Sequence, residues 1–321
     1  MKKILIITDY GKKIGAGHFM RCKILAEKLR FFVKVDIVTS KKVSENINNI
    51  KYIYSKNIID KKNFINKIKI GEYSSVIIDT YKKKERLIES FKISKKKIYC
   101  FDDFGKNKIK TNIINQNPFF SKKDYSKSLS TNILVGQKYT CIQSNLKQRN
   151  MNFKKFNFLV SCGMYDQNNN IIKIVNFLDK LDQRMPITAN IALNSNSKNY
   201  PKISKIIKSK KNFYLVKDQN EYAKSLKKCN IAITTLGVST WERFFIGMPC
   251  MIFCKEKKEE IILKKILSNK CALEFHTKKI DKNLKYFKEL KKLEILLFKI
   301  SNKTKNLFTL NGASNLTKKI I

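Results

Sequence analysis

Short runs of β-branched and apolar residues alternate with helical patterns along the first half of the chain. Runs typical of strands occur at Ile4–Thr8, Val33–Thr39, Tyr52–Tyr54, Val76–Asp79, Ile98–Phe101, Asn112–Ile114 and Ile133–Val135. Helical patterns occur between them at Met20–Phe32, Val43–Asn49, Lys62–Ile70 and Lys84–Phe91. Strands that are apolar on both faces need helices on both faces, so this alternation predicts βαβ units around a parallel sheet.

A polar stretch at Ser144–Lys155 interrupts the alternation, which then restarts. The second set of expected strands is Phe156–Ser161, Ile187–Leu193, Phe213–Val216, Ile231–Thr234 and Cys250–Cys254. The expected helices are Ile171–Leu181, Tyr200–Ser209, Tyr222–Cys229, Thr240–Ile246 and Glu259–Asn269, followed by one or two helices after Asn283. The sequence therefore predicts an α/β fold of two Rossmann-like domains with parallel sheets facing a central cleft. We expect the domains at residues 1–147 and 155–321, the second including the C-terminal helices.

The chain carries a large positive charge. Its 321 residues include 68 Lys and Arg against 25 Asp and Glu, a formal charge of +43, and 43 % are hydrophobic, which is enough for a large core. Six of the 68 basic residues are arginine, the residue that binds phosphates and base edges with two parallel hydrogen bonds. We attribute the lysine excess to genomic base composition and expect no nucleic-acid partner.

We expect neither a secretory leader nor a membrane span. The apolar run Ile4–Ile7 is shorter than the roughly 7–15 residues of a signal-peptide core. The eight scattered cysteines are typical of buried, reduced thiols, so we expect a cytoplasmic protein that is a monomer or a weak oligomer. The chain has only two histidines, and we expect no metal site and no cofactor.

A glycine-rich loop, Gly15-Ala16-Gly17-His18, follows the first expected strand and directly precedes a helix. Loops at the carboxyl ends of strands bind the ligands of such sheets, and glycine lets a ligand approach the backbone. His18 is a candidate general base there, or it merely caps the helix. The loop is not a dinucleotide fingerprint, because the third glycine of that motif is replaced by Met20.

Carboxylates stand at the ends of two further strands. Asp79 is followed by Thr80 and Tyr81, and the pair Asp102-Asp103 ends the next strand. These residues either take part in a site or cap the following helices.

Two loops of the second half have a composition suited to phosphate binding. Gly163 and Asp166 lie in the loop after the first strand of that half, and Gly237 opens a segment containing Ser239, Thr240 and Glu242. Backbone amides at such helix starts can hold a diphosphate, and a carboxylate one turn later can accept ribose hydroxyls. The segment from Ser239 to Glu242 equally fits a capping box.

Taken together, these segments resemble the hydrolases of UDP-2,4-diacetamido-2,4,6-trideoxy-β-L-altropyranose in pseudaminic acid biosynthesis. The matching segments are Ile14–Cys22, Ile77–Tyr81, Phe101–Asp103, Asn112–Asn117, Leu134–Tyr139, Gly163–Asp166, Gly237–Glu242 and Gly247–Pro249. The resemblance implies the two-domain glycosyltransferase B fold, with UDP on the glycine loops and Glu242 of the second domain. It also implies that His18 activates a water for inverting attack on the anomeric carbon, beside Tyr81.

The candidate residues follow from the motifs and the resemblance together. The catalytic candidates are His18, Asp79 and Tyr81. The substrate-binding candidates are Gly15, Gly17, Arg21, Asp102, Asp103, Gly163, Asp166, Gly237, Ser239, Thr240 and Glu242. Two alternatives stay open: a glycosyltransferase of the same fold, and a non-catalytic basic binding protein. The chain also departs from the family pattern, because Cys254-Lys255-Glu256-Lys257-Lys258 replaces an Asn-Gln pair after the Gly-x-Pro strand.

Overall fold

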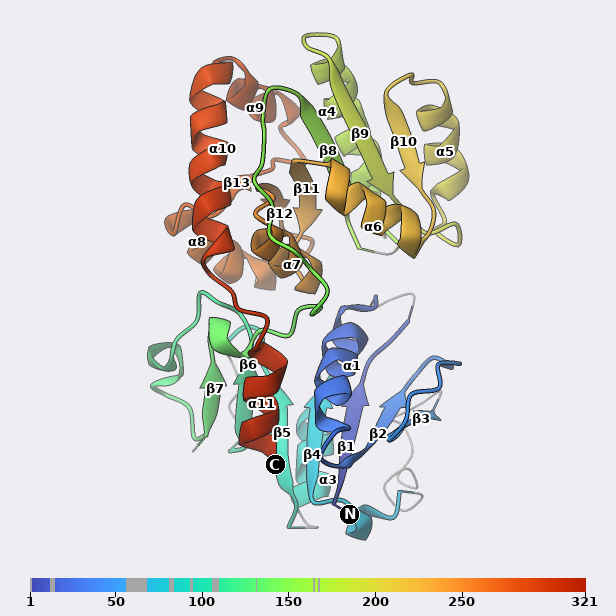
Figure 1. The fold of residues 1–321 in the computed structure, drawn as a ribbon, viewed down its shortest axis with the longest axis vertical. Coiled ribbons are helices and arrows are strands. Elements are labelled where there is room, and N and C mark those ends of the chain that lie inside the picture. The colour runs from blue at the N-terminus through green and yellow to red at the C-terminus, as the bar shows by residue number, and fades with distance from the viewer. Residues whose placement is uncertain are drawn as a thin grey trace. The chain divides into compact units, whose positions relative to one another are not determined.

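The chain divides into two compact units. Unit 1 comprises Met1–Ser144 together with Thr309–Ile321, and unit 2 comprises Asn145–Phe308 (Figure 1). The computed structural model describes residues 2–11, 15–55, 68–80, 84–92, 95–105, 110–130, 132–163, 165, 166 and 168–321.

The described part of unit 1 forms a seven-stranded parallel sheet in the order β3-β2-β1-β4-β5-β6-β7. Its strands are β1 (Lys3–Thr8), β2 (Lys34–Thr39), β3 (Ile50–Tyr54), β4 (Ser75–Asp79), β5 (Lys97–Phe101), β6 (Asn112–Asn115) and β7 (Ile133–Val135). Its helices are α1 (Gly17–Leu29), α3 (Lys84–Lys92) and α11 (Gly312–Ile320), with short 3₁₀ turns η1 (Ile70–Glu72), η2 (Lys122–Tyr125) and η3 (Gln137–Tyr139). The winding direction reverses between β1 and β4.

The two faces of β1 are buried against different helices. Ile4 and Ile6 belong to a core cluster shared with α1 and α11, whereas Leu5 and Ile7 belong to a second cluster shared with α3. Figure 1 shows α1 and α11 on the same side of the sheet. Burial on both faces explains why the strand is apolar at successive positions and does not alternate.

The described part of unit 2 repeats this winding with a six-stranded parallel sheet in the order β10-β9-β8-β11-β12-β13. Its strands are β8 (Phe156–Ser161), β9 (Ile187–Ala192), β10 (Phe213–Val216), β11 (Ile231–Thr235), β12 (Cys250–Phe253) and β13 (Leu273–Glu274). Its helices are α4 (Asn170–Asp182), α5 (Tyr200–Lys208), α6 (Gln219–Lys228), α7 (Val238–Ile246), α8 (Glu260–Ser268), α9 (Ile280–Leu284) and α10 (Leu290–Lys305), with 3₁₀ turns η4 (Lys257–Glu259) and η5 (Lys285–Phe287). Here the direction reverses between β8 and β11.

The last helix, α11, belongs to unit 1, although the sequence placed it in the second domain. Its buried face joins the same core cluster as α1, and the Tyr99 hydroxyl of β5 donates to the carbonyl of Lys319 at 2.9 Å. A Cβ built on Gly312 would lie only 2.0 Å from the carbonyl oxygen of Thr140, so the start of α11 lies directly against that backbone. Apolar periodicity identifies such a helix but does not say which core buries it.

The prediction of two Rossmann-like parallel sheets is confirmed, and one predicted helix is wrong. Val43–Asn49 forms no helix: Ile47 makes an isolated bridge with Ile50, and Asn49 is left-handed at φ 63°. Ser and Asn side chains in this stretch compete for backbone hydrogen bonds, which disfavours a helix interior. Most of the predicted helix Lys62–Ile70 lies outside the described residues, and β13 was not predicted because it is only two residues long.

Among the described residues, no helix is both long and apolar enough to cross a bilayer.

Candidate active site

The start of α1 places three polar or ionisable side chains on one face of the helix at the edge where β1 and β4 end. His18, Arg21 and Cys22 are spaced i, i+3 and i+4, so their side chains lie over the same turn. All three are buried. Asp79, the last residue of β4, pairs in register with Thr8 of β1 and lies beside them. The winding reversal thus brings the helix start to the carboxyl end of β4, where ligands of such sheets bind.

The imidazole of His18 makes a short hydrogen bond with Asp79. Its Nδ1 lies 2.6 Å from Oδ1 of Asp79, whose carboxyl is 1 % exposed. The pKa of Asp79 is raised by burial but lowered more strongly by the charges of Arg21 and His18, so the net effect is a pKa well below the usual value. An ionised carboxylate can only accept, so the shared proton belongs on Nδ1 of His18. In the neutral ring, Nε2 is then the nitrogen that can take up a proton.

Arg21 binds two carboxylates at once. Nε and Nη2 donate to the two oxygens of Asp79 at 2.6 and 2.5 Å, and Nη1 and Nη2 donate to the two oxygens of Asp103 at 2.6 and 3.0 Å. The guanidinium also stacks 4.4 Å above the ring of Phe101, the last residue of β5. Cys22 adds a weak contact from Sγ to Asp79 at 3.4 Å. Planar guanidinium geometry suits this double bidentate arrangement, which lysine could not reproduce.

The pKa values of Arg21 and Asp103 follow the same pattern. Burial opposes the charged form of each group, but the opposite charge of the partner dominates, so the Asp103 pKa is lowered and the Arg21 pKa is raised. At neutral pH the cluster therefore holds two carboxylates and one guanidinium, a net negative charge next to the imidazole of His18.

The other predicted residues of unit 1 have different surroundings. Gly15, at φ 87°, closes an antiparallel bridge with Gly11, and Gly17 begins α1. The Asp102 carboxyl accepts a hydrogen bond from the backbone amide of Phe104 at 3.4 Å. Tyr81 lies outside the described residues.

Sequence reasoning missed Asp9, which follows β1. Its side chain is 5 % exposed and accepts a hydrogen bond from the hydroxyl of Thr80. The signal was present, because Asp9 is a carboxylate at the end of a buried strand, as Asp79 is.

In unit 2, the carboxyl ends of β8 and β11 are adjacent, with Ser161 paired to Thr234. Helix α7 begins at Val238 directly after this edge, with Gly237 as its N-cap and no side-chain cap. The capping-box prediction is therefore wrong. The helix starts before Ser239, and the Thr240 hydroxyl instead donates to the carbonyl of Thr235 at 2.8 Å.

A buried arginine that the sequence reasoning missed lies next to this turn. Arg243 of α7 is 0 % exposed. Its Nη1 donates to the hydroxyls of Thr234 and Ser239 at 3.0 and 3.3 Å, and its Nη2 donates to the hydroxyl of Tyr222 at 2.7 Å. The preceding residue, Glu242, is also buried within α7. The rarity of arginine in this chain was the only sequence signal for Arg243.

Asp166 and Gly163 have distinct local roles. Both carboxylate oxygens of Asp166 accept backbone amides at the start of α4, from Asn170 at 2.9 Å and Ile171 at 2.8 Å. Asp166 therefore satisfies two amides of the first turn of α4, whose N-cap residue is Asn169. Gly163 is left-handed at φ 82°, and a Cβ built on it would lie 4.0 Å from Nζ of Lys255.

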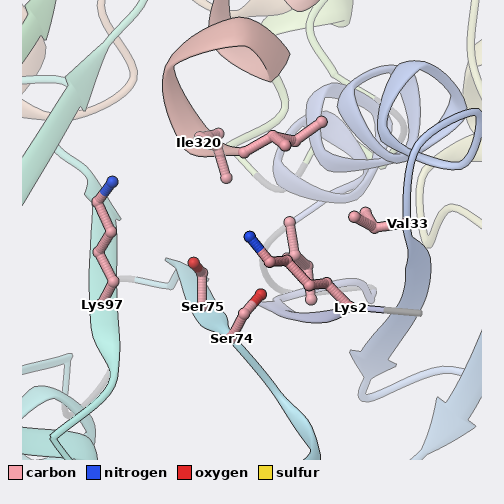
Figure 2. Close-up of a pocket in the computed structure, with 8 residues that line it drawn as sticks. Lys2, Val33, Ser74, Ser75, Lys97 and Ile320 are labelled. Carbon is pink, nitrogen blue, oxygen red and sulfur yellow. The ribbon is translucent and has the colours of Figure 1, made fainter.

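A pocket of about 190 Å³ lies at the opposite edge of the unit 1 sheet (Figure 2). Its lining comes from the amino ends of β1, β4 and β5 and from the end of α11. The lining residues are Lys2, Ile4, Val33, Ser74, Ser75, Lys97, Ile320 and Ile321. Because ligands of doubly wound sheets bind at the carboxyl ends, this pocket is separate from the candidate site.

Comparison with known proteins identifies distant relatives. No known protein-family profile matches the chain. An uncharacterized protein of Methanocaldococcus jannaschii, MJ1062, is 26 % identical over 78 % of this chain, but the match spans only 55 % of that protein's length. The spore coat polysaccharide biosynthesis protein SpsG of Bacillus subtilis is 22 % identical, with 84 % of this chain and 82 % of SpsG aligned.

Solved structures share the whole fold. MnaA of Staphylococcus aureus in complex with UDP superposes with a TM-score of 0.71 at 12 % identity, covering 100 % of this chain and 96 % of MnaA. A glycosyltransferase from Rickettsia africae superposes with a TM-score of 0.65 at 12 % sequence identity, covering 99 % of this chain and 98 % of that enzyme. A UDP-GlcNAc 2-epimerase from Neisseria meningitidis bound to UDP-GlcNAc superposes with a TM-score of 0.62 at 14 % sequence identity, covering 99 % of both chains. The fold of this chain, two parallel-sheet Rossmann-like domains, is the glycosyltransferase B type.

Proposed function

We propose that this protein hydrolyses a UDP-linked diacetamido-trideoxy sugar at the anomeric carbon, in pseudaminic-acid-type nonulosonate biosynthesis. The observation that carries the proposal is the hydrogen bond between His18 Nδ1 and Asp79. A buried histidine oriented by a carboxylate at the carboxyl edge of such a sheet is equipped to take a proton from an attacking hydroxyl group. The resemblance described from the sequence supplies the substrate.

In the proposed reaction, Nε2 of His18 removes a proton from water as the water oxygen bonds to the anomeric carbon. The bond from that carbon to the diphosphate oxygen breaks, and UDP leaves with the electron pair. The products are UDP and the free sugar with inverted configuration, and the proton passes from His18 to solvent. Asp79 fixes the tautomer, and Arg21 keeps Asp79 ionised. Tyr81 is proposed to lie beside the reacting carbon.

The comparisons support the class of substrate. SpsG is named for polysaccharide biosynthesis, and two of the structures with this fold contain UDP or UDP-GlcNAc. Binding of UDP is proposed for unit 2, at the turn before α7 and at Glu242.

The second candidate is a glycosyltransferase, favoured by the fold shared with the enzyme of Rickettsia africae. The same histidine would then deprotonate a sugar hydroxyl, and that hydroxyl would replace water as the nucleophile.

Measuring UDP release from a panel of UDP-sugars, with and without added acceptors, tests both candidates. Release without an acceptor supports the hydrolase, and release that depends on an acceptor supports the transferase. His18→Asn should abolish release in either case, whereas His276→Asn, at the only other histidine of the chain, should leave it intact. Unchanged turnover in His18→Asn would remove the proposed base.

A further inference from the structure

The two deeply buried arginines of this chain differ in their counter-charges. Arg21, 5 % exposed, is bound by two carboxylates, whereas Arg243, 0 % exposed, donates only to the hydroxyls of three neutral side chains. Within the described residues no carboxylate lies within ion-pair distance of Arg243, and its Nε makes no hydrogen bond. A buried charge without a counter-charge is unfavourable, so an anion near Arg243 would be strongly stabilised.

The guanidinium of Arg243 points to the turn between β11 and α7. Ser239, four residues earlier on α7, and Thr234, on β11, both accept from its Nη1. The exposed Gly237 opens this turn at φ 155°, and a Cβ built on it would meet no atom within 4 Å. The N-terminus of α7, with its positive dipole end, and the unobstructed backbone at Gly237 therefore lie next to the buried guanidinium.

Ser239 links this charge to the surface. Its oxygen accepts from Arg243, so its hydroxyl hydrogen must point elsewhere, and the residue is half-buried in the first turn of α7. A hydroxyl polarised in this way is a suitable donor to an anionic oxygen.

A second cation belongs to the same edge of the unit 2 sheet. Nζ of Lys255 lies beside Gly163, in the loop after β8. Arg243 donates to the hydroxyl of Thr234, which in turn donates to the carbonyl of Ser161, the last residue of β8. Strands β8, β11 and β12 are neighbours whose carboxyl ends lie at one edge of the sheet. Lys255 follows β12, and Arg243 donates to Thr234 near the end of β11, so both cations belong to this edge. Lys255 also belongs to the segment that replaces the Asn-Gln pair of the family pattern.

We infer that Arg243, Ser239 and Lys255 form the diphosphate-binding group of unit 2, with Ser239 and Lys255 donating to phosphate oxygens and Arg243 supplying buried positive charge. The inference rests on the proposed function only for the identity of the nucleotide as UDP. Arg243, Ser239 and Lys255 would then bind the leaving diphosphate, and the sequence motifs did not single out these three residues together.

Calorimetric titration of the full chain with UDP, uridine and inorganic pyrophosphate tests this inference. Arg243→Met should weaken UDP binding roughly 10- to 100-fold, and Lys255→Ala and Ser239→Ala should each weaken UDP binding several-fold. The affinity for uridine should stay unchanged, because these groups bind the diphosphate. Lys257→Ala is the matched control, an exposed lysine two residues from Lys255, and should bind UDP as the wild type does.

Thermal unfolding of each variant separates binding from folding. Arg243→Lys should retain part of the UDP affinity, because it keeps the charge. If Arg243→Met is unfolded, the exposed Lys255 and half-buried Ser239 variants still decide the question. Three results would overturn the inference. They are a parallel loss of uridine and UDP affinity, unaltered UDP affinity in both Lys255→Ala and Ser239→Ala, and a wild type that binds neither UDP nor pyrophosphate. Charge-dependent UDP binding without sugar release would overturn the proposed function and leave this inference standing.

Discussion

Arg21 donates to both carboxylate oxygens of Asp79, although the two residues are 58 positions apart in the chain. The same carboxylate accepts the hydrogen bond from His18, so the guanidinium and the imidazole converge on Oδ1 of Asp79. Arg21 also binds Asp103, and the position of the imidazole therefore depends on residues from α1, β4 and the end of β5. Changes in this cluster should alter activity and stability in separable ways.

Asp79→Asn should lower turnover by roughly a thousandfold or more while leaving UDP affinity near the wild-type value. An amide in place of the carboxylate can stabilise the tautomer with the proton on Nε2, which cannot act as a base, and it no longer stabilises the imidazolium. Steady-state UDP release and UDP titration on the same preparation measure the two effects. Comparable losses in both would mean that Asp79 is needed for folding and not specifically for proton transfer.

Arg21→Met should destabilise unit 1 by about 3–5 kcal/mol, because it leaves two buried carboxylates without their cation. Urea unfolding followed by circular dichroism measures this change. Arg86→Met, at an exposed position of α3, is the matched control and should change the free energy of unfolding by less than about 0.5 kcal/mol. Equal stability of the two variants would show that the Arg21 cluster contributes little to folding.

The stability of the protein should fall in acid, and Asp103→Asn should reduce that fall. The pKa of Asp79 and of Asp103 is lower in the folded chain than the roughly 3.9 of an unfolded aspartate. Their contribution to the free energy of unfolding is therefore complete above about pH 5, and it is lost as the pH falls through their pKa values in the folded chain. Urea midpoints measured from pH 7 to pH 3 should converge for wild type and Asp103→Asn, whereas Asp281→Asn, at an exposed position, should parallel the wild type throughout.

Gly312→Ala should destabilise unit 1 by about 2 kcal/mol or more. The added methyl would lie 2.0 Å from the carbonyl oxygen of Thr140, so α11 must shift away from the core that it shares with α1. Gly71→Ala is the control, because a Cβ there would meet nothing within 4 Å. Thermal unfolding of both variants decides the matter, and equal midpoints would show that α11 can move without loss of packing.

The sequence predicted the parts of the fold that local patterns determine. Runs such as Ile4–Thr8 are apolar at successive positions and are followed by a helical pattern, and they form strands as expected. The failure at Val43–Asn49 is also local, because apolar spacing outweighed the poor helix propensity of Ser and Asn in the prediction. The placement of α11 is different in kind: it depends on which core accepts Ala313 and Leu316, and no pattern within the helix contains that information.

Those candidate-site residues that lie at strand ends or in the loops after them were predictable from the sequence. His18 and Asp79 were found because each occupies a loop or strand end at which parallel sheets bind ligands, and the structure brings them together. Their link through Arg21 was not predictable from spacing, because it depends on three-dimensional hydrogen bonds over 58 and 82 positions of chain. Arg243 was missed because it lies inside a helix, where a charged residue ordinarily points to solvent.

The return of α11 to unit 1 affects the order in which the protein can fold during synthesis. Unit 2 is an insertion within unit 1, since residues of unit 1 both precede Asn145 and follow Phe308. On the ribosome, the core around α1 must remain without Leu316 and Ile320 until all of unit 2 has been translated. Unit 2 can therefore reach its final packing first, while the unit that holds His18 is completed last.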